Sequence, residues 1–103
     1  MKTLRDPKRK PTHPGETLRE DVLPALNMTQ AEFAKRLGVS RLTVSELLLE
    51  KRGMSADMAM RVGKLTNTTP ESWLRMQYAL DLWLLEREPK RYRNIEPIAV
   101  SAS

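Results

Sequence analysis

The side chains best suited to chemistry stand at the start of a short predicted helix, at Arg41, Leu42, Thr43 and Ser45. At about 100° per residue, they fall on the side opposite an apolar stripe, with Arg41 at the tip. An arginine can donate two hydrogen bonds to a guanine, a hydroxyl can contact bases or phosphates, and a leucine can pack on a thymine methyl. These residue types predict readout of a DNA major groove.

Other chemistries find little support in the chain. It has no cysteine and a single histidine, His13, and we find no phosphate loop, metal-ligand set or nucleophile–base pair. We therefore expect neither an enzyme nor a cofactor or metal. His13 precedes Pro14 and Gly15, where a structural role at the start of a helix is the favoured interpretation.

Residues 29–52 must position these side chains, and their pattern predicts two short helices joined by a tight turn. Thr29 and Glu32 form a capping box, Gly38 supplies a positive-φ residue, and Ser40 caps the second helix. The inward sides carry apolar residues at helical spacing, namely Phe33, Ala34, Leu37, Val44, Leu47 and Leu48. This is what a helix-turn-helix needs, although an ordinary helical hairpin would show the same periodicity.

Length and composition predict one all-α domain. The chain has 103 residues, of which 40% are hydrophobic and 30% charged, and helical spacing covers nearly all of residues 15–88. No run approaches the roughly 18 apolar residues of a membrane span, and no apolar secretory signal is present. We expect a cytoplasmic protein that does not bind membranes.

Charge is unevenly distributed and divides the chain. Residues 1–12 hold five basic side chains against one acidic, whereas residues 13–85 hold nine of each, so little of the net charge of +5 lies in the domain itself. We expect a disordered basic arm at residues 1–12, a helix-turn-helix domain at residues 13–88 and a mobile tail at residues 89–103. The arm either contacts phosphates or only aids solubility.

Helices on both sides of residues 29–52 complete the predicted domain. A first helix starts near His13 and is limited by Pro24; Ser55 caps a fourth helix, and Thr69 caps the longest one, which Pro89 ends. The long helix carries two apolar arcs. One arc suits its own core, with Trp73, Met76, Ala79, Leu80, Trp83 and Leu84, whereas the other predicts a dimer interface, with Leu74, Tyr78, Leu82 and Leu85. Gln77 with Asp81, and Arg75 with Glu86, divide the arcs.

Four segments together resemble the HigA (VapI-type) antitoxins of the repressor-like helix-turn-helix superfamily. They are HPGE at residues 13–16, TQAEFAKRLGVS at 29–40, KRGMSADMAMRVGKL at 51–65 and TPESWLRMQYALDLW at 69–83. The resemblance implies a five-helix domain that binds an inverted repeat in double-stranded DNA as a homodimer, and a HigB-type toxin partner that cleaves messenger RNA. It also implies that Gln30 contacts a phosphate and that Arg41, Leu42, Thr43 and Ser45 face bases.

One departure from the family pattern concerns the end of the second motif helix. The family usually has Asn-Gly there, whereas this chain has Leu49 and Glu50, so we expect the helix to continue and the turn to move to Gly53. Lys51 and Arg52 would then supply the phosphate contacts. Two alternatives stay open: a protein that mainly sequesters a toxin, and a stand-alone transcription factor without one.

Overall fold

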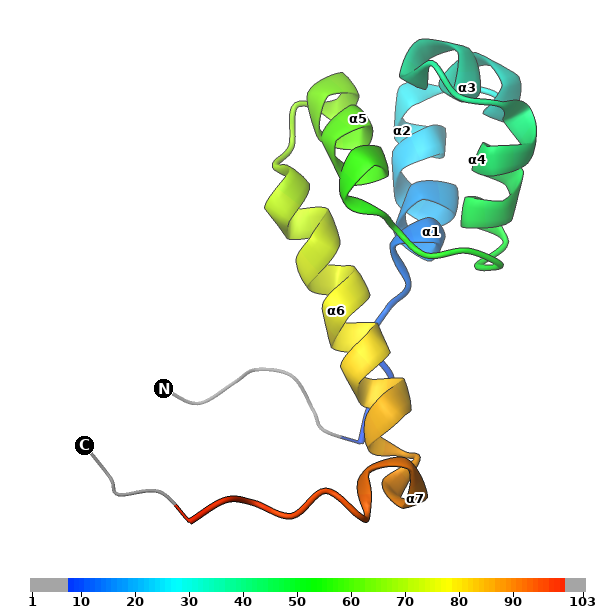
Figure 1. Ribbon diagram of the computed structural model, residues 1–103. Coiled ribbons are helices and arrows are strands. Elements are labelled where there is room, and N and C mark those ends of the chain that lie inside the picture. The colour runs from blue at the N-terminus through cyan, green and yellow to red at the C-terminus, as the bar shows by residue number, and fades with distance from the viewer. Residues whose placement is uncertain (1–7, 100–103) are drawn as a thin grey trace.

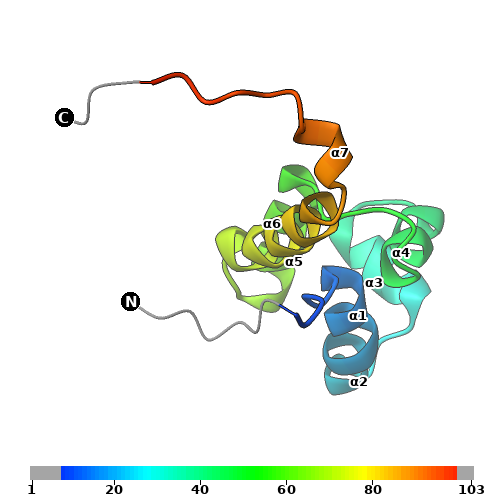
Figure 2. The same cartoon turned by 90° about the horizontal axis from the view of Figure 1, so that it is seen from below.

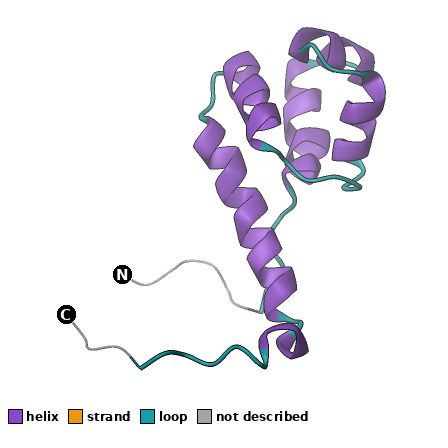
Figure 3. Cartoon of the chain, viewed as in Figure 1, coloured by secondary structure: helices purple, strands orange, loops and turns teal. Residues whose placement is uncertain are grey.

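The computed structural model describes residues 8–99, and that part of the chain is helical without strands. The elements are α1 (Pro14–Thr17), the π-helical turn η1 (Leu18–Val22), α2 (Leu23–Leu26), α3 (Gln30–Leu37), α4 (Arg41–Leu48), α5 (Ala56–Thr66), α6 (Pro70–Glu86) and α7 (Pro89–Tyr92). The first three follow one another without a break. Short loops join the later helices, and α6 extends beyond the others (Figures 1 and 3). The all-α prediction is confirmed.

The first helical segment continues past its proline by widening one turn. Pro24 has no N–H, and its ring would collide with the carbonyl of Glu20 in a regular α-helix. The Leu23 N–H instead donates to the oxygen of Leu18, five residues back, which makes η1 a π-turn. The segment therefore runs to Leu26, further than the sequence predicted, and ends at Asn27 with a φ of 53°.

The hydrophobic core lies between α3, α4 and α5, with the first helical segment and the start of α6 closing it. Phe33, Val44, Ala59 and Val62 are fully buried within it, and the predicted inward faces of α3 and α4 are confirmed. Helix α6 packs mainly against α5, so its far end protrudes from the domain (Figure 1).

Two glycines allow backbone segments to approach closely. A Cβ on Gly15 would collide with the carbonyl of Leu47, so α1 lies directly against the end of α4. His13 Nδ1 accepts a hydrogen bond from the Gly15 N–H at 2.8 Å, which caps α1 and confirms the structural role expected for this histidine. Gly63 similarly leaves room for the backbone of Thr68 and Pro70.

Gln77 lies inside the domain, not on the boundary between two arcs of α6 as predicted. Its side chain is 8% exposed, and its Oε1 accepts the N–H of Met54 at 2.7 Å while its Nε2 donates to Asp81 at 2.8 Å. The amide leaves no space for a Cβ on Gly53. A larger residue at position 53 would have to displace this amide, and Gly53 lies in the loop after α4 and does not end a helix.

The predicted extension of the second motif helix is wrong, because α4 ends at Leu48. Glu50 adopts a φ of 63°, its N–H donates to Leu47, and the N–H of Lys51 donates to Glu46. These bonds form a Schellman motif, the same helix ending that Asn27, Gly38 and Asn67 make elsewhere in the chain. Glu50 thus occupies a left-handed position that usually falls to glycine or asparagine.

A short helix begins the segment predicted as the tail. Pro89–Tyr92 forms α7, and residues 93–99 then project away from the helices (Figure 2). Residues 8–12 contain no helix and run down from α1 beside α6 (Figures 1 and 2). The rest of the predicted arm, residues 1–7, lies outside the described residues.

Replacing Glu50 with Asn should stabilise the protein. A left-handed conformation costs an ordinary residue about 1 kcal/mol more than it costs asparagine, so we expect Glu50→Asn to raise the free energy of unfolding by about that amount. Urea denaturation followed by circular dichroism would measure it. Glu50→Ala is the control, since it removes the carboxylate but keeps the strained backbone; equal stability of the two variants would contradict the explanation.

Candidate nucleic-acid interface

Helices α3 and α4 are defined at their N-termini by side-chain caps that were predicted from the sequence. Thr29 Oγ1 accepts the Glu32 N–H at 3.1 Å while Glu32 Oε1 accepts the Thr29 N–H at 3.5 Å, which completes the capping box. Ser40 Oγ accepts the Thr43 N–H at 3.1 Å at the start of α4. The turn between them passes through Gly38, whose φ is 75°. The two helices therefore form the predicted helix-turn-helix.

Their C-terminal ends are held by arginines from outside the motif. Arg61 of α5 donates to the carbonyl of Leu37 at 2.8 Å, and Arg19 of η1 donates to the carbonyl of Leu48 at 2.6 Å. A cation at this end of a helix satisfies a carbonyl and opposes the negative pole of the helix dipole. Both helices are thus anchored at their carbonyl ends by neighbouring elements.

Acidic partners keep these two arginines in place. Arg61 Nε contacts Asp57 at 2.9 Å, one helical turn earlier in α5. Arg19 bonds Glu20 at 2.8 Å and lies 3.4 Å from Glu50. The hydrogen bond to Glu20 is the largest cause that raises the pKa of Arg19, with Glu50 adding to it. The raised pKa favours the cationic form of Arg19, which the bond to the Leu48 carbonyl needs.

The residues predicted to face bases lie together on the outward side of α4. Arg41, its first residue, is exposed, and Leu42 is 67% exposed. Ser45 and Thr43 are half-buried beside them, and the Thr43 hydroxyl lies 2.9 Å from that of Ser40. The N-terminal turn of α4 therefore presents a guanidinium, hydroxyls and an aliphatic side chain to solvent.

The residues predicted to contact phosphates lie at the start of α3 and in the loop after α4. Gln30 begins α3 and is half-buried, while Lys51 is exposed in the loop after α4. Arg52 is also exposed, but its guanidinium bonds Glu46 of α4 at 2.7 Å. A carboxylate on the outward side of α4 thus holds one of the two loop cations, which the sequence did not reveal.

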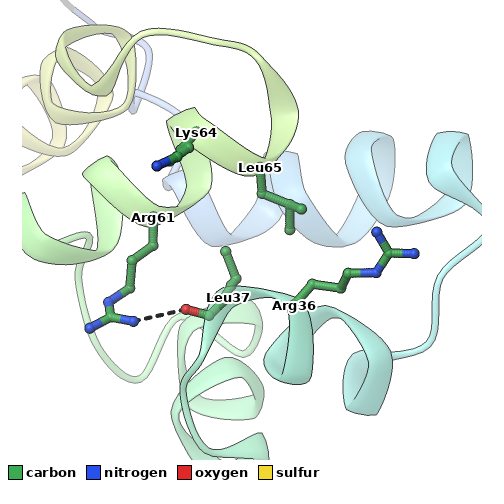
Figure 4. A pocket seen from close by; sticks show the side chains of 5 residues that line it. All are labelled: Arg36, Leu37, Arg61, Lys64 and Leu65. Carbon is green, nitrogen blue, oxygen red and sulfur yellow. Dashed lines mark hydrogen bonds between the residues drawn. The ribbon is translucent and has the colours of Figure 1, made fainter.

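A shallow pocket of about 460 Å³ lies between α3 and α5 and is rich in cations. It is lined by Arg36, Leu37, Arg61, Lys64 and Leu65. In Figure 4 the guanidinium of Arg36 and the ammonium of Lys64 point away from each other, and Arg61 turns toward the Leu37 carbonyl. Because the charges diverge, the pocket does not form a site for one anion.

The four residues predicted for the dimer interface do not share one environment. Tyr78 and Leu82 are 57% and 58% exposed on α6, and Leu85 is half-buried. Leu74, in contrast, packs against the core of its own chain. Leu84, assigned to the inner arc, is 44% exposed because α6 has already left the core at this point.

Two of the contacts that position the motif were missed in the sequence. The pairing of Arg61 with Asp57 had a visible signal, since residues four apart share a helix face. The bond from Arg19 to Leu48 joins residues 29 apart and had none. Among residues 8–99, no group of three or more potential metal ligands occurs. No helix within that span is long and apolar enough to cross a membrane.

Known proteins resemble this chain over most of its length. The family model described as helix-turn-helix matches residues 18–74. The antitoxin HigA-1 of Vibrio cholerae is 33% identical over 95% of this chain and 93% of its own. A solved Pseudomonas aeruginosa antitoxin, HigA with higBA promoter, is 35% identical with a TM-score of 0.78, covering 87% of this chain and all of that one. Antitoxin GraA in complex with its operator is 36% identical, with a TM-score of 0.80 over 95% and 100% of the two chains.

The cap from Arg61 can be tested with an isosteric change. Arg61→Met keeps the aliphatic stem but leaves the Leu37 carbonyl without its charged donor, so we expect unfolding to require about 1 kcal/mol less. Thermal denaturation would measure the loss. Arg36→Met is the matched control, because Arg36 points away from that carbonyl (Figure 4), and it should change stability by less than about 0.5 kcal/mol. Equal effects of the two variants would argue against the cap.

Proposed function

Because this chain belongs to the helix-turn-helix family of HigA-type antitoxins, we propose that it represses transcription by binding operator DNA through α3 and α4. The observation that carries the proposal is the exposed N-terminal turn of α4, which holds Arg41 and Leu42 outward on an anchored helix. Related structures of the same fold are described with a promoter and with an operator. The protein would act in the cytoplasm as a non-enzymatic regulator.

In this proposal α4 enters the major groove and reads base edges. Arg41 donates two hydrogen bonds to a guanine, and Leu42 packs on a thymine methyl. Ser45 contacts a base or a phosphate from its half-buried position, and Thr43 does so through its hydroxyl, which is hydrogen-bonded to that of Ser40. The body of the domain contributes little attraction of its own, because its charges balance between residues 13 and 85.

Phosphate contacts would fix the register of α4 on the duplex. Gln30 at the start of α3 and Lys51 after α4 flank the outward surface on two sides. Arg52 can bind a phosphate only after its ion pair with Glu46 breaks. Such contacts are independent of sequence and weaken with salt.

We also propose that the protein works as a homodimer and neutralises a HigB-type toxin. Tyr78 and Leu82 on α6 are the exposed apolar residues that a second copy would cover, with Leu85 beside them. Two α4 helices would then enter successive major grooves about 34 Å apart, on a near-palindromic operator. The toxin partner is inferred from the antitoxin relatives. A stand-alone transcription factor without a toxin is the alternative, and the neighbouring reading frame would distinguish the two.

Replacing Arg41 with Ala should impair recognition of one base pair. We expect a loss of about 1 to 3 kcal/mol on the operator upstream of the gene, and a smaller loss on a scrambled duplex. Gel-shift titrations with both duplexes would measure this. Lys51→Ala is the comparison, because loss of a phosphate contact should weaken both duplexes alike. Equal losses on both duplexes for Arg41→Ala would exclude a base contact.

Removing the carboxylate at Glu46 should release Arg52 for DNA. With Glu46→Gln we expect affinity for a scrambled duplex to rise by roughly twofold to fivefold, and the slope of log affinity against log salt to steepen by about one unit. Fluorescence anisotropy between 50 and 300 mM salt would measure both. Glu71→Gln removes the same charge from the exposed start of α6 and is the control. If the two variants behaved identically, the gain in affinity would come from the change in net charge and not from the release of Arg52.

A further inference from the structure

Residues 89–99 expose apolar side chains that their own chain does not cover. Tyr92, Ile95 and Ile98 are 43%, 71% and 83% exposed, and the two isoleucines are the most exposed large apolar side chains among residues 8–99. Both views show this segment leaving the end of α6 and running away from the remaining helices (Figures 1 and 2). An exposed apolar series of this kind is characteristic of an interaction segment.

The direction of the segment is set at the end of α6. Arg87 donates to the carbonyl of Trp83 at 3.0 Å, and its guanidinium lies 3.4 Å from the centroid of the Trp83 ring. These contacts close α6, and Pro89 then begins α7. The tail therefore departs from a fixed corner of the molecule.

The sequence of the tail places its isoleucines on one side. Pro97 fixes its own φ and restricts Glu96 to extended conformations, which favours a polyproline-like chain with three residues per turn. Ile95 and Ile98 are three residues apart and would then point in the same direction. The missing N–H of Pro97 disfavours addition to a sheet edge, so contacts of this segment must come from side chains.

Tyr78, Leu82 and Leu85 form the outer face of α6. We infer that residues 93–99 of one copy pack across this face in a second copy. This inference rests on the proposed homodimer and names the segment of the second copy that covers these three residues. Charge favours the approach at the start of the segment, since Lys90, Arg91 and Arg93 are basic and α6 has three acidic side chains and one basic; residues 93–99 themselves carry one basic and one acidic side chain. Seven residues at the polyproline rise reach about 22 Å, enough to cover the roughly 10 Å of helix from Tyr78 to Leu85.

The absence of native cysteines allows a direct crosslinking test. An untagged Leu82→Cys protein would be mixed with a longer, tagged Ile98→Cys protein and then oxidised. We expect a disulfide-linked species whose mass is the sum of one untagged Leu82→Cys chain and one tagged Ile98→Cys chain. Met60→Cys in place of Leu82→Cys is the control, because Met60 is 61% exposed on α5, away from the outer face of α6, and it should give at least fivefold less of the mixed species.

A second measurement reports the contribution of the tail to assembly. The variant Ile95→Asn with Ile98→Asn should raise the dimer dissociation constant at least tenfold in sedimentation experiments, with an unchanged helical circular dichroism spectrum. An unchanged dissociation constant would overturn the inference. So would a disulfide within one chain in a protein that carries both Leu82→Cys and Ile98→Cys.

The results also separate this inference from the dimer itself. If the unmodified chain sediments as a monomer at all concentrations, both the dimer and the tail contact are wrong. If it forms dimers but Leu82→Cys and Ile98→Cys do not crosslink above the Met60→Cys control, only the tail contact is wrong.

Discussion

Helix α4, which is proposed to read DNA, is held at its C-terminal end by contacts with the first helical segment. Gly15 allows α1 to lie against the carbonyl of Leu47, and Arg19 donates to the next carbonyl, that of Leu48. A Cβ at position 15 would collide with the Leu47 carbonyl, so a side chain there would force α1 and α4 apart. Because α4 is held at this end, its N-terminal turn can expose Arg41 and Leu42 while the helix keeps a fixed orientation, which recognition of base edges requires.

Local signals in the sequence were sufficient to place the helices but not to place what lies between them. Thr29, Ser40, Ser55 and Thr69 were each predicted as N-caps, and each accepts the backbone N–H three residues on. The end of α4 was predicted wrongly because glutamate has no preference for a left-handed backbone, so its residue type did not reveal the Schellman bonds that end the helix there. Gln77 was misplaced for the same reason, since its partner Met54 is 23 residues away.

The site residues show the same division. Helical periodicity correctly placed Arg41 and Leu42 outward, because a face opposite a buried stripe must meet solvent. It could not reveal that Glu46 holds Arg52, because the loop that brings them together depends on the turn at Glu50. Along α6 the same periodicity failed in part: Leu74 is packed and Leu84 is exposed, since the helix outruns the core that its inner arc was expected to meet.

Gln77 connects α6 to the loop that follows α4 through a buried hydrogen bond. On α6 it accepts the N–H of Met54, and that loop begins where α4 ends. A dimer formed through the outer face of α6 would therefore position α4 through two routes, the packing of α6 on α5 and this buried hydrogen bond. Close-packed interiors transmit displacement with little loss, so a partner bound at α6 would alter the separation of the two α4 helices. In the proposed dimer, half-site spacing and assembly would thus both depend on α6.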